Sequence, residues 1–556
     1  MLPSFLSFIP SFFATHILFF AFTCLTQTHA YPHNRQDVAL TRKGSDLSHE
    51  AAQSIMTNSG SELRGTSAAW NQPSSASATV SKIASVTSSS TINERASNAM
   101  FTSSPATVAN GSSLTETLTS STPVTTSFTP VSGLAFPSVV ASPSIIASSY
   151  KTLTSLIPSI LSNANSIAVH SWEIGAFTET LLEVYYPKLS PFEWDASAFD
   201  GEDIPWSVLK IATDAISHYN WTGAPGQDFS KSLQDYLFPD TTPHAHVSQA
   251  LVGGDGALGD PVSLIPAVWL LAKFAKQNDL RDKLGLRCPE DYAWAVGNQL
   301  DYLFNGPTSD NGTISQREAR FEVWSDMGYM ITPSLAYLGL DISDDSLLKK
   351  ALEQFILESS AMLDTDQLIY QHIPATDARL WATGNGWMTY GLMRNVSYSS
   401  GIDLITTDCL QLASVKTSPF AEDLSSLKFE AEQTIAGVFK ALFDQLGEDS
   451  LLPDYMLQDN STLSLGDTAG TALTVAAYYR FLEIAPHLTS QDLTAKAEKA
   501  FDGVVAKIDD NGWVTHCVDP MGTYGWVVYP EDYSLHSPEG QAFAAKMWKA
   551  RTDAGY

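Results

Sequence analysis

The sequence predicts an all-α fold in which paired helices are arranged in a double ring, an (α/α) barrel. About a dozen helical patterns follow one another along residues 165–556, and convincing strands are few. Some of these patterns, such as 263–275, are apolar on every side, whereas others, such as 346–362, have one polar face. Inner helices shielded by a ring of outer ones account for that division, and the loops of the inner helices would then surround one cavity.

Residues 1–164 are predicted to lie outside the folded domain. The first 30 residues contain an apolar run centred on residues 17–22 and end in Thr28-His29-Ala30, a pattern typical of a cleaved secretory signal. Residues 31–164 consist mainly of Ser, Thr, Ala, Val and Pro, a composition that cannot bury enough apolar surface to offset the entropy of ordering. We expect this segment to be disordered, either as an O-glycosylated stalk or as a plain linker, and the domain to span residues 165–556.

The helical patterns of the domain can be followed in order. They cover residues 171–186, 205–219, 261–277, 289–304, 321–338, 346–362, 387–394, 421–446, 468–484, 490–508 and 538–551. The first has apolar residues at helical spacing with Glu173, Glu179 and Glu183 largely off that stripe, so we expect it to be amphipathic. Pro289 suits a first helical turn, and Asn511-Gly512 favours a tight turn.

The composition restricts the partners of the protein. The chain has 31 basic and 60 acidic residues, a formal net charge of −29, which argues against nucleic acid or an anionic membrane as a partner. No segment after the signal is apolar enough to span a bilayer, so we expect a soluble, extracellular protein, most simply a monomer. At most one disulfide can form among Cys288, Cys409 and Cys517, because Cys24 leaves with the signal. Sequons that agree with secretion occur at Asn110, Asn220, Asn311, Asn395 and Asn460.

The stretch from residue 321 to residue 330 holds the first candidate for chemistry. It places Asp326 among aromatic residues and methionines, and no Lys or Arg follows until Lys349. A carboxyl group in apolar surroundings without a cation has a raised pKa, so Asp326 is a candidate proton donor. Trp324 and Asp326 can face one cavity only if a helix begins here, since residues two apart in a helix point about 200° apart. The alternative is that Asp326 caps a helix or is a satisfied buried carboxylate.

A second stretch, residues 380–388, reads Leu-Trp-Ala-Thr-Gly-Asn-Gly-Trp-Met. Gly384-Asn385-Gly386 is typical of a turn rather than of a helix interior. Trp381 and Trp387 would then flank this turn, where their indole rings can stack on a sugar.

Other residues could complete a site. Asp260 precedes Pro261 and is either a helix cap or a second carboxylate opposite Asp326. His372 is close enough in sequence to Trp381 to reach the same cavity, although a lone histidine is usually structural. Asp467 is an obvious cap for the small-residue helix that follows it. No metal-binding, phosphate-loop or nucleophile-elbow pattern occurs, so we expect catalysis by carboxyl groups with no metal and no cofactor.

These motifs, taken together and in order, resemble glycoside hydrolase family 105, the unsaturated rhamnogalacturonyl hydrolases, and more distantly family 88, the unsaturated glucuronyl hydrolases. The resemblance rests on Trp324-Ser-Asp326, His372, the Trp381 to Trp387 stretch, Asp467-Thr-Ala-Gly-Thr-Ala and Ser537-Pro-Glu-Gly-Gln, and it spans residues 172–551. It implies an (α/α)6 barrel of six helical hairpins. It also implies an oligosaccharide substrate, a product of pectin lyases that ends in a uronic acid with a C4=C5 double bond.

The resemblance also implies roles for individual residues. Enzymes of this kind hydrate an enol ether and need one tuned acid/base instead of the carboxylate pair of most glycosidases. Asp326 would be the acid/base, Trp324, Trp381 and Trp387 would line the sugar sites, His372 would assist, and Asp260 would be the second aspartate. Thr383 departs from the family pattern, which commonly has Arg at this position to bind the substrate. Arg379 or Arg394 are candidates to replace that arginine.

Two other functions remain open on the sequence. A different (α/α)-barrel glycosidase could cleave saturated sugars if a second carboxylate, such as Asp260, lay across the cavity from Asp326. A non-catalytic carbohydrate-binding protein of the cell wall, displayed on the Ser/Thr-rich stalk, would bind sugars without turning them over.

Overall fold

The structure is a computed structural model, and it describes residues 148–201, 203–239, 245–408, 419–458, 464–518 and 536–556. The predicted signal peptide and residues 31–147 of the predicted stalk lie outside the described residues. All that follows concerns the described part of the chain.

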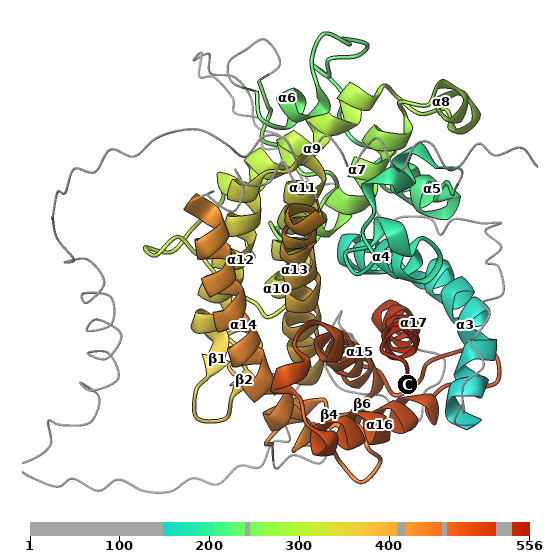
Figure 1. Cartoon of the computed structure of the whole chain (residues 1–556), viewed down its shortest axis with the longest axis vertical. Helices are drawn as coiled ribbons and strands as arrows, with labels where there is room; N and C mark the ends of the chain where they lie inside the picture. Colours follow the sequence, from blue (N-terminus) through green and yellow to red (C-terminus); the bar gives the residue numbers. More distant parts are fainter. Residues whose placement is uncertain (1–147, 202, 240–244, 409–418, 459–463, 519–535) are drawn as a thin grey trace, which may run out of the picture. The chain divides into compact units, whose positions relative to one another are not determined.

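Six helices of the described residues form a closed inner ring (Figure 1). They are α4 (Ser171–Tyr185), α7 (Ile265–Phe274), α11 (Thr332–Ile342), α13 (Ala382–Asp408), α15 (Thr468–Ile484) and α17 (Pro538–Asp553). Each helix contacts the next one in this order, and α17 closes the ring by packing against α4. The first and last inner helices are therefore neighbours.

Six further helices cover the inner ring from outside. They are α3 (Ser148–Ile167), α5 (Trp206–Ala215), α9 (Pro289–Phe304), α12 (Asp345–Met362), α14 (Pro419–Phe443) and α16 (Gln491–Val505). Each packs on one or two inner helices: α5 on α4 and α7, α12 on α11 and α13, α16 on α15, and α3 on α17. This double ring confirms the predicted (α/α)6 barrel.

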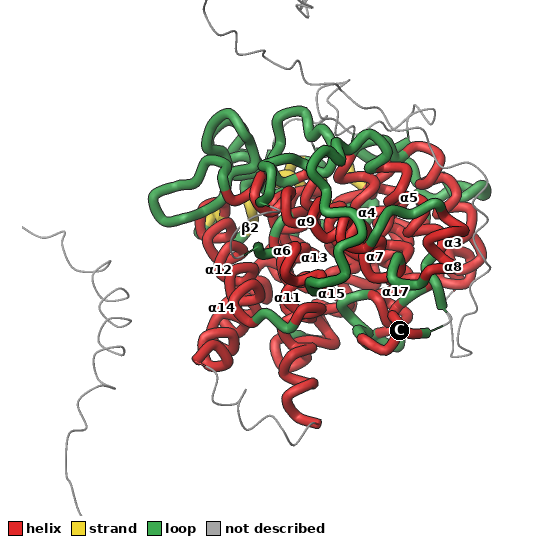
Figure 2. Tube along the Cα trace, turned by 90° about the horizontal axis from the view of Figure 1, so that it is seen from above, coloured by secondary structure: helices red, strands yellow, loops and turns green. Residues whose placement is uncertain are grey.

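The remaining elements are short. The small helices are α6 (Leu233–Leu237), α8 (Asn278–Leu284), α10 (Met327–Met330), η1 (Pro187–Leu189), η2 (Ala196–Asp200), η3 (Asp260–Leu264) and η4 (Pro486–Leu488). The strands form three antiparallel pairs, β1 (Leu363–Asp364) with β2 (Ile369–Tyr370), β3 (Leu380–Trp381) with β5 (Tyr455–Met456), and β4 (Leu452–Pro453) with β6 (Gly466–Asp467). Most of the long loops and the short strands gather at one end of the helices (Figure 2).

The prediction that the first helix, 171–186, is amphipathic is wrong. Helix α4 belongs to the inner ring, and Glu173, Glu179 and Glu183 are all buried. Two of these glutamates pair with cations from other inner helices: Glu179 with Arg394 of α13, and Glu183 with Lys546 of α17 at 2.6 Å. Their partners lie more than 200 positions away in the chain, so the local pattern could not show that these charges belong inside.

The domain begins earlier than predicted. Helix α3 starts at Ser148, 17 positions before the expected start at residue 165, and it packs against α17. Leu153, Ile157 and Leu161 of α3 have no exposed surface. The serines and threonines around these residues obscure their helical spacing, so the composition of the segment resembles that of the stalk.

The predicted turn at Gly384-Asn385-Gly386 is also wrong, because these residues form the first turns of α13. The glycines are required by close packing: a Cβ atom on Gly384 would lie 2.2 Å from Oγ of Ser325. Asn385 uses its side chain to hold the preceding strand, since its Oδ1 accepts from the backbone N–H of Tyr370 at 2.8 Å and its Nδ2 donates to the Tyr370 carbonyl at 2.9 Å. Small residues here bring α13 against the Trp324–Asp326 segment.

Two further observations concern the predictions about membrane-spanning segments and disulfides. None of the helices in the described ranges has the length and apolar character needed to cross a bilayer. Cys288 and Cys517 are free thiols, and Cys409 lies outside the described residues.

Candidate active site

Acidic side chains gather where the inner helices begin. One carboxyl group lies in the first turn of, or shortly before, five of the six inner helices, with η3 and α10 taken as the starts of α7 and α11, and Thr383 is in the first turn of the sixth, α13. The five are Glu173, Asp260, Asp326, Asp467 and Glu539. The positive ends of the helix dipoles favour acidic groups at these positions. The negative charge of Asp326 acts on both Asp260 and Glu539, so the groups from α17 and from the starts of α7 and α11 face one region.

Asp326 lies directly before α10, at the point where an extended loop turns into helix. Its backbone carbonyl accepts from the N–H of Tyr329 at 3.0 Å, but its side chain does not cap the helix. Oγ of Ser325 lies 3.4 Å from Oδ2 of Asp326. Burial raises the pKa of the half-buried Asp326 carboxyl, and the nearby His372 offsets this in part. The start of a helix is the geometry that the proton-donor hypothesis required.

Asp260 supplies the second carboxyl group. It is the first residue of η3, which leads into α7, and its side chain does not cap that helix. Its Oδ1 accepts a hydrogen bond of 2.6 Å from Nε2 of Gln316. Burial and the negative charge of Asp326 raise the pKa of Asp260 to about 7. Asp260 and Asp326 therefore lie close enough for their charges to interact. Two negative charges at this place are unfavourable, so the pair tends to keep a proton.

His372, whose charge acts on Asp326, packs against both Trp324 and Trp381. The Trp324 and His372 rings lie 6.2 Å apart in a T-shaped arrangement, and the His372 and Trp381 rings lie 4.5 Å apart. The backbone N–H of Ser325 donates to the His372 carbonyl at 2.9 Å, which fixes the two segments to each other. Nδ1 of His372 is 3.1 Å from Oδ2 of Asp377, so the imidazole ring is held in one orientation.

The exposure of these residues differs. His372 and Trp381 are only 2% and 1% exposed, whereas Trp324 and Asp326 are partly exposed. Thr383 is buried, and its hydroxyl donates to Oδ2 of Asp467 at 2.6 Å. Asp467 in turn caps α15 by accepting from the backbone N–H groups of residues 469 and 470, as the sequence predicted. Thr383 thus joins α13 to α15. Among the residues of this group, Trp324 and Asp326 are the ones exposed to a ligand.

The structure places Trp387 away from this group. Its ring is 2% exposed and packs edge-on against Tyr329 and Phe543, each at 4.6 Å between centroids. It lies in the hydrophobic core because α13 already begins at Ala382, which turns residue 387 toward the neighbouring inner helices. Arg394, one of the two candidates to replace the family arginine, is also buried in the ring and bound to Glu179.

Two acidic residues of the site were not predicted. Glu539, which belongs to the Ser537-Pro-Glu-Gly-Gln motif but has no role in the sequence analysis, accepts hydrogen bonds of 2.8 Å from the Trp172 indole and from Oγ of Ser537. Burial raises the pKa of Glu539, and burial together with Glu539 raises the pKa of Glu173 to about 8. The available signal was position: Glu539 stands at the start of an inner helix, as Asp326 does.

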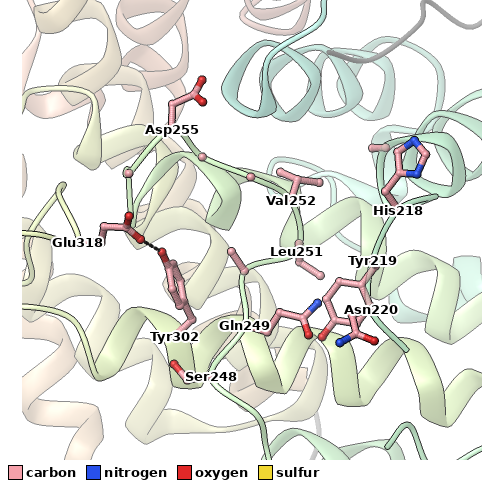
Figure 3. Close-up of a pocket in the computed structure, with 15 residues that line it drawn as sticks. His218, Tyr219, Asn220, Ser248, Gln249, Leu251, Val252, Asp255, Tyr302 and Glu318 are labelled. Carbon is pink, nitrogen blue, oxygen red and sulfur yellow. Dashed lines mark hydrogen bonds between the residues drawn. The ribbon is translucent and has the colours of Figure 1, made fainter. Parts of the chain in front are cut away.

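A pocket of about 440 Å³ is lined in part by the loop that precedes Asp260. Figure 3 shows Tyr302 donating to Glu318 on one wall, with Gln249 and Asn220 on the other. The glycine-rich segment 253–256 is part of the pocket lining, and Nη2 of Arg317 donates to the Asp255 carbonyl in this segment. In the described part of the chain, no group of three or more His, Cys, Asp and Glu side chains is arranged to hold a metal ion.

Comparisons with known proteins bear on the fold and the family. The family model of Glycosyl Hydrolase Family 88 matches residues 287–544. No curated protein matches the chain. A possible member of the GH105 family from Salmonella enterica serovar Paratyphi A is similar in structure, with 14% identity and a TM-score of 0.50, over 76% of this chain and 98% of that one.

Two other solved structures are similar at lower TM-scores. A glycosyl hydrolase family 88 protein from Bacteroides vulgatus has 15% identity and a TM-score of 0.45, over 73% of this chain and 99% of that one. The unsaturated glucuronyl hydrolase from Bacillus sp. GL1 has 12% identity and a TM-score of 0.40, over 72% of this chain and 96% of that one. At such identities the Salmonella structure supports the fold alone. The chain therefore has the fold of that possible GH105 member, and residues 287–544, a little under half of its length, match the Glycosyl Hydrolase Family 88 model.

Proposed function

We propose that the chain removes a terminal uronic acid with a C4=C5 double bond from oligosaccharides, by adding water across the enol ether. The observation that carries this proposal is the Asp326 carboxyl group, half-buried with a raised pKa and placed between Trp324, His372 and a second acid. A carboxyl group that stays neutral can donate a proton, and the rings beside it offer a surface for a sugar. Unsaturated glucuronyl hydrolases are among the structurally similar proteins.

The reaction needs one group that gives and then recovers a proton. The neutral carboxyl of Asp326 donates its proton to C4, and the ring oxygen shares the positive charge that develops at C5. A water molecule adds to C5 and its proton returns to the Asp326 carboxylate. The resulting hemiketal opens to a keto acid and releases the neighbouring sugar. Burial raises the pKa of both Asp326 and Asp260, and the negative charge of Asp326 adds to the rise at Asp260, so the pair can hold the proton that the first step requires.

The finer substrate assignment is part of the proposal. The order of motifs from Trp324 to Ser537 resembles the unsaturated rhamnogalacturonyl hydrolases, so we propose products of rhamnogalacturonan lyases as the substrates. The signal-like residues 1–30 lead us to propose that the protein is secreted and meets these products outside the cell. Residue 31 should then be the N-terminus of the protein recovered from culture medium, which N-terminal sequencing tests.

The decisive experiment follows the ultraviolet absorbance of the enol ether in a lyase-generated disaccharide. The wild-type protein should remove this absorbance and release the second sugar, and deuterium from heavy water should appear at C4. Asp326→Asn should lower kcat at least about 100-fold, the scale of a lost general acid. The matched control is Asp344→Asn, which alters a carboxylate that caps α12 outside the site. Turnover by Asp326→Asn at the wild-type rate would refute the assignment.

One observation favours a second function, the hydrolysis of ordinary, saturated glycosides. Asp260 is a second carboxyl group near Asp326 with a pKa of about 7, and a pair of carboxyl groups is what hydrolysis of ordinary glycosides uses. A saturated uronide with the same linkage separates the two reactions, because it lacks the double bond. Cleavage of the saturated compound with no activity on the unsaturated one would favour this second function, and binding of either without cleavage would favour a carbohydrate-binding protein.

A further inference from the structure

The proposed substrate is an anion, and it enters a region that is rich in carboxyl groups. Asp260, Asp326 and Glu539 influence one another there, and the whole chain carries a formal charge of −29. Thr383 stands where the resembling family has an arginine, and its hydroxyl is engaged with Asp467. Resting on the proposed function, we infer that Arg317 binds the carboxylate of the unsaturated sugar and so selects free uronates over their esters.

The position of Arg317 is set by its loop. Its guanidinium lies over the Trp324 ring, 5.7 Å from the centroid, and its Nη2 donates to the Asp255 carbonyl at 2.9 Å. Residues 257 and 317 form an antiparallel bridge, which fixes the backbone on both sides. Gly256 makes the approach possible, because its φ of +80° suits glycine and a Cβ atom there would lie 3.0 Å from Nη2. The side chain is half-buried and held on the face of a residue of the site.

Arg317 is electrostatically connected to the reacting groups. Its positive charge acts on the carboxyl of Asp260, which in turn senses Asp326. A sugar that contacts Trp324 and presents C4 to Asp326 therefore has a guanidinium within reach of its carboxylate. Guanidinium groups bind carboxylates through two parallel N–H···O bonds, which fixes orientation as well as charge.

The other arginines near the site are already engaged. Arg379 makes two hydrogen bonds to Asp377, at 2.6 and 2.8 Å. Arg394 is buried against Glu179, and Arg320 pairs with Glu322 at 2.6 Å. The ion pairs found within the described ranges do not include Arg317, whose hydrogen bond goes to a backbone carbonyl. Its guanidinium therefore keeps charge and donors for a ligand.

The test compares Arg317→Gln with the wild-type protein on an unsaturated uronide and on its methyl ester. Loss of a charge-assisted hydrogen-bond pair should raise KM for the free acid by about 10- to 100-fold, with a smaller change in kcat. KM for the ester should change less than about threefold, so the preference for the acid disappears. Arg317→Lys should recover part of that preference. Arg320→Gln is the matched control in the same loop and should keep it.

The outcomes separate this inference from the proposed function. If the wild-type protein turns over the unsaturated acid and Arg317→Gln keeps the same ratio of acid to ester, the role of Arg317 is wrong and the proposed function stands. If the wild-type protein turns over neither compound, the proposed function is wrong. Calorimetric binding of both compounds to Asp326→Asn, with and without Arg317→Gln, then still decides: an unchanged acid-to-ester ratio of Kd values overturns the inference, and its loss supports it. Circular dichroism of each variant confirms that it is folded.

Discussion

Replacing Asp260 by asparagine should change how the stability of the fold depends on pH. In the folded chain, burial and Asp326 raise the pKa of Asp260 from 3.8 to about 7. In the unfolded chain the group ionises in its ordinary range. Between these values the folded state holds a proton that the unfolded state has lost, so the free energy of unfolding falls as pH rises.

The size of the effect follows from the shift. Each pKa unit corresponds to 1.36 kcal/mol, so a rise of about three units costs the wild-type fold about 4 kcal/mol at alkaline pH relative to acidic pH. The cost is absent below about pH 4, grows between about pH 4 and pH 7, and is complete above that. Asparagine cannot ionise, and its Oδ1 can still accept the hydrogen bond from Gln316.

The assay is equilibrium urea unfolding, followed by tryptophan fluorescence at several pH values. The difference in unfolding free energy between Asp260→Asn and the wild-type protein should grow by about 4 kcal/mol from pH 4 to pH 8 in favour of the variant. Asp344→Asn reports what the loss of one negative charge does by itself in a chain of net charge −29. A difference that stays constant with pH would show that Asp260 ionises normally and would refute the electrostatic account of the pair.

Three other substitutions test the site. Gly384→Ala puts a Cβ atom 2.2 Å from Oγ of Ser325, so it should lower stability by about 1–3 kcal/mol, measured by urea unfolding, and should lower kcat. Asp377→Asn should destabilise the fold by about 2 kcal/mol at neutral pH. That loss should vanish in acid, because hydrogen bonds from Arg379 and the histidine beside it outweigh burial and hold the Asp377 pKa below its usual range. Trp387→Phe should lower Tm and leave KM within about twofold, whereas a role in sugar stacking predicts a higher KM.

The helices could be predicted because the spacing of apolar residues within each helix is a local signal. Periodicity and terminal residues identified most of the helices, and the division into apolar and amphipathic segments indicated two rings. The predictions were wrong where the role of a residue depends on a partner that is distant in the sequence. The glutamates of α4 resemble a surface stripe until Arg394 and Lys546 are brought beside them. The glycines at 384 and 386 resemble a turn until Ser325 is packed against them.

The site shows the same limit. Asp326 could be identified from its own neighbours, because an acid among aromatic residues with no nearby cation in the sequence is unusual. Glu539 could not, since what distinguishes it is its proximity to Asp326 across the ring. Arg317 could not either, since its position over the Trp324 ring depends on how the loop between α9 and α10 folds. The spacing of Trp387 to Trp381 predicts a place in the sugar site, but helix α13, which begins directly after Trp381, turns Trp387 into the core.

The neighbouring positions of α4 and α17 have a consequence for synthesis of the chain. Helix α17, which carries Lys546 at 2.6 Å from Glu183, comes after the other five inner helices in the chain, so α4 is synthesised long before its partner. Until α17 has followed, a nascent chain exposes the groove that this helix fills, and the α4 glutamates lack one of their counter-ions. A chain truncated before residue 538 cannot close the ring and would be a substrate for chaperones and proteases.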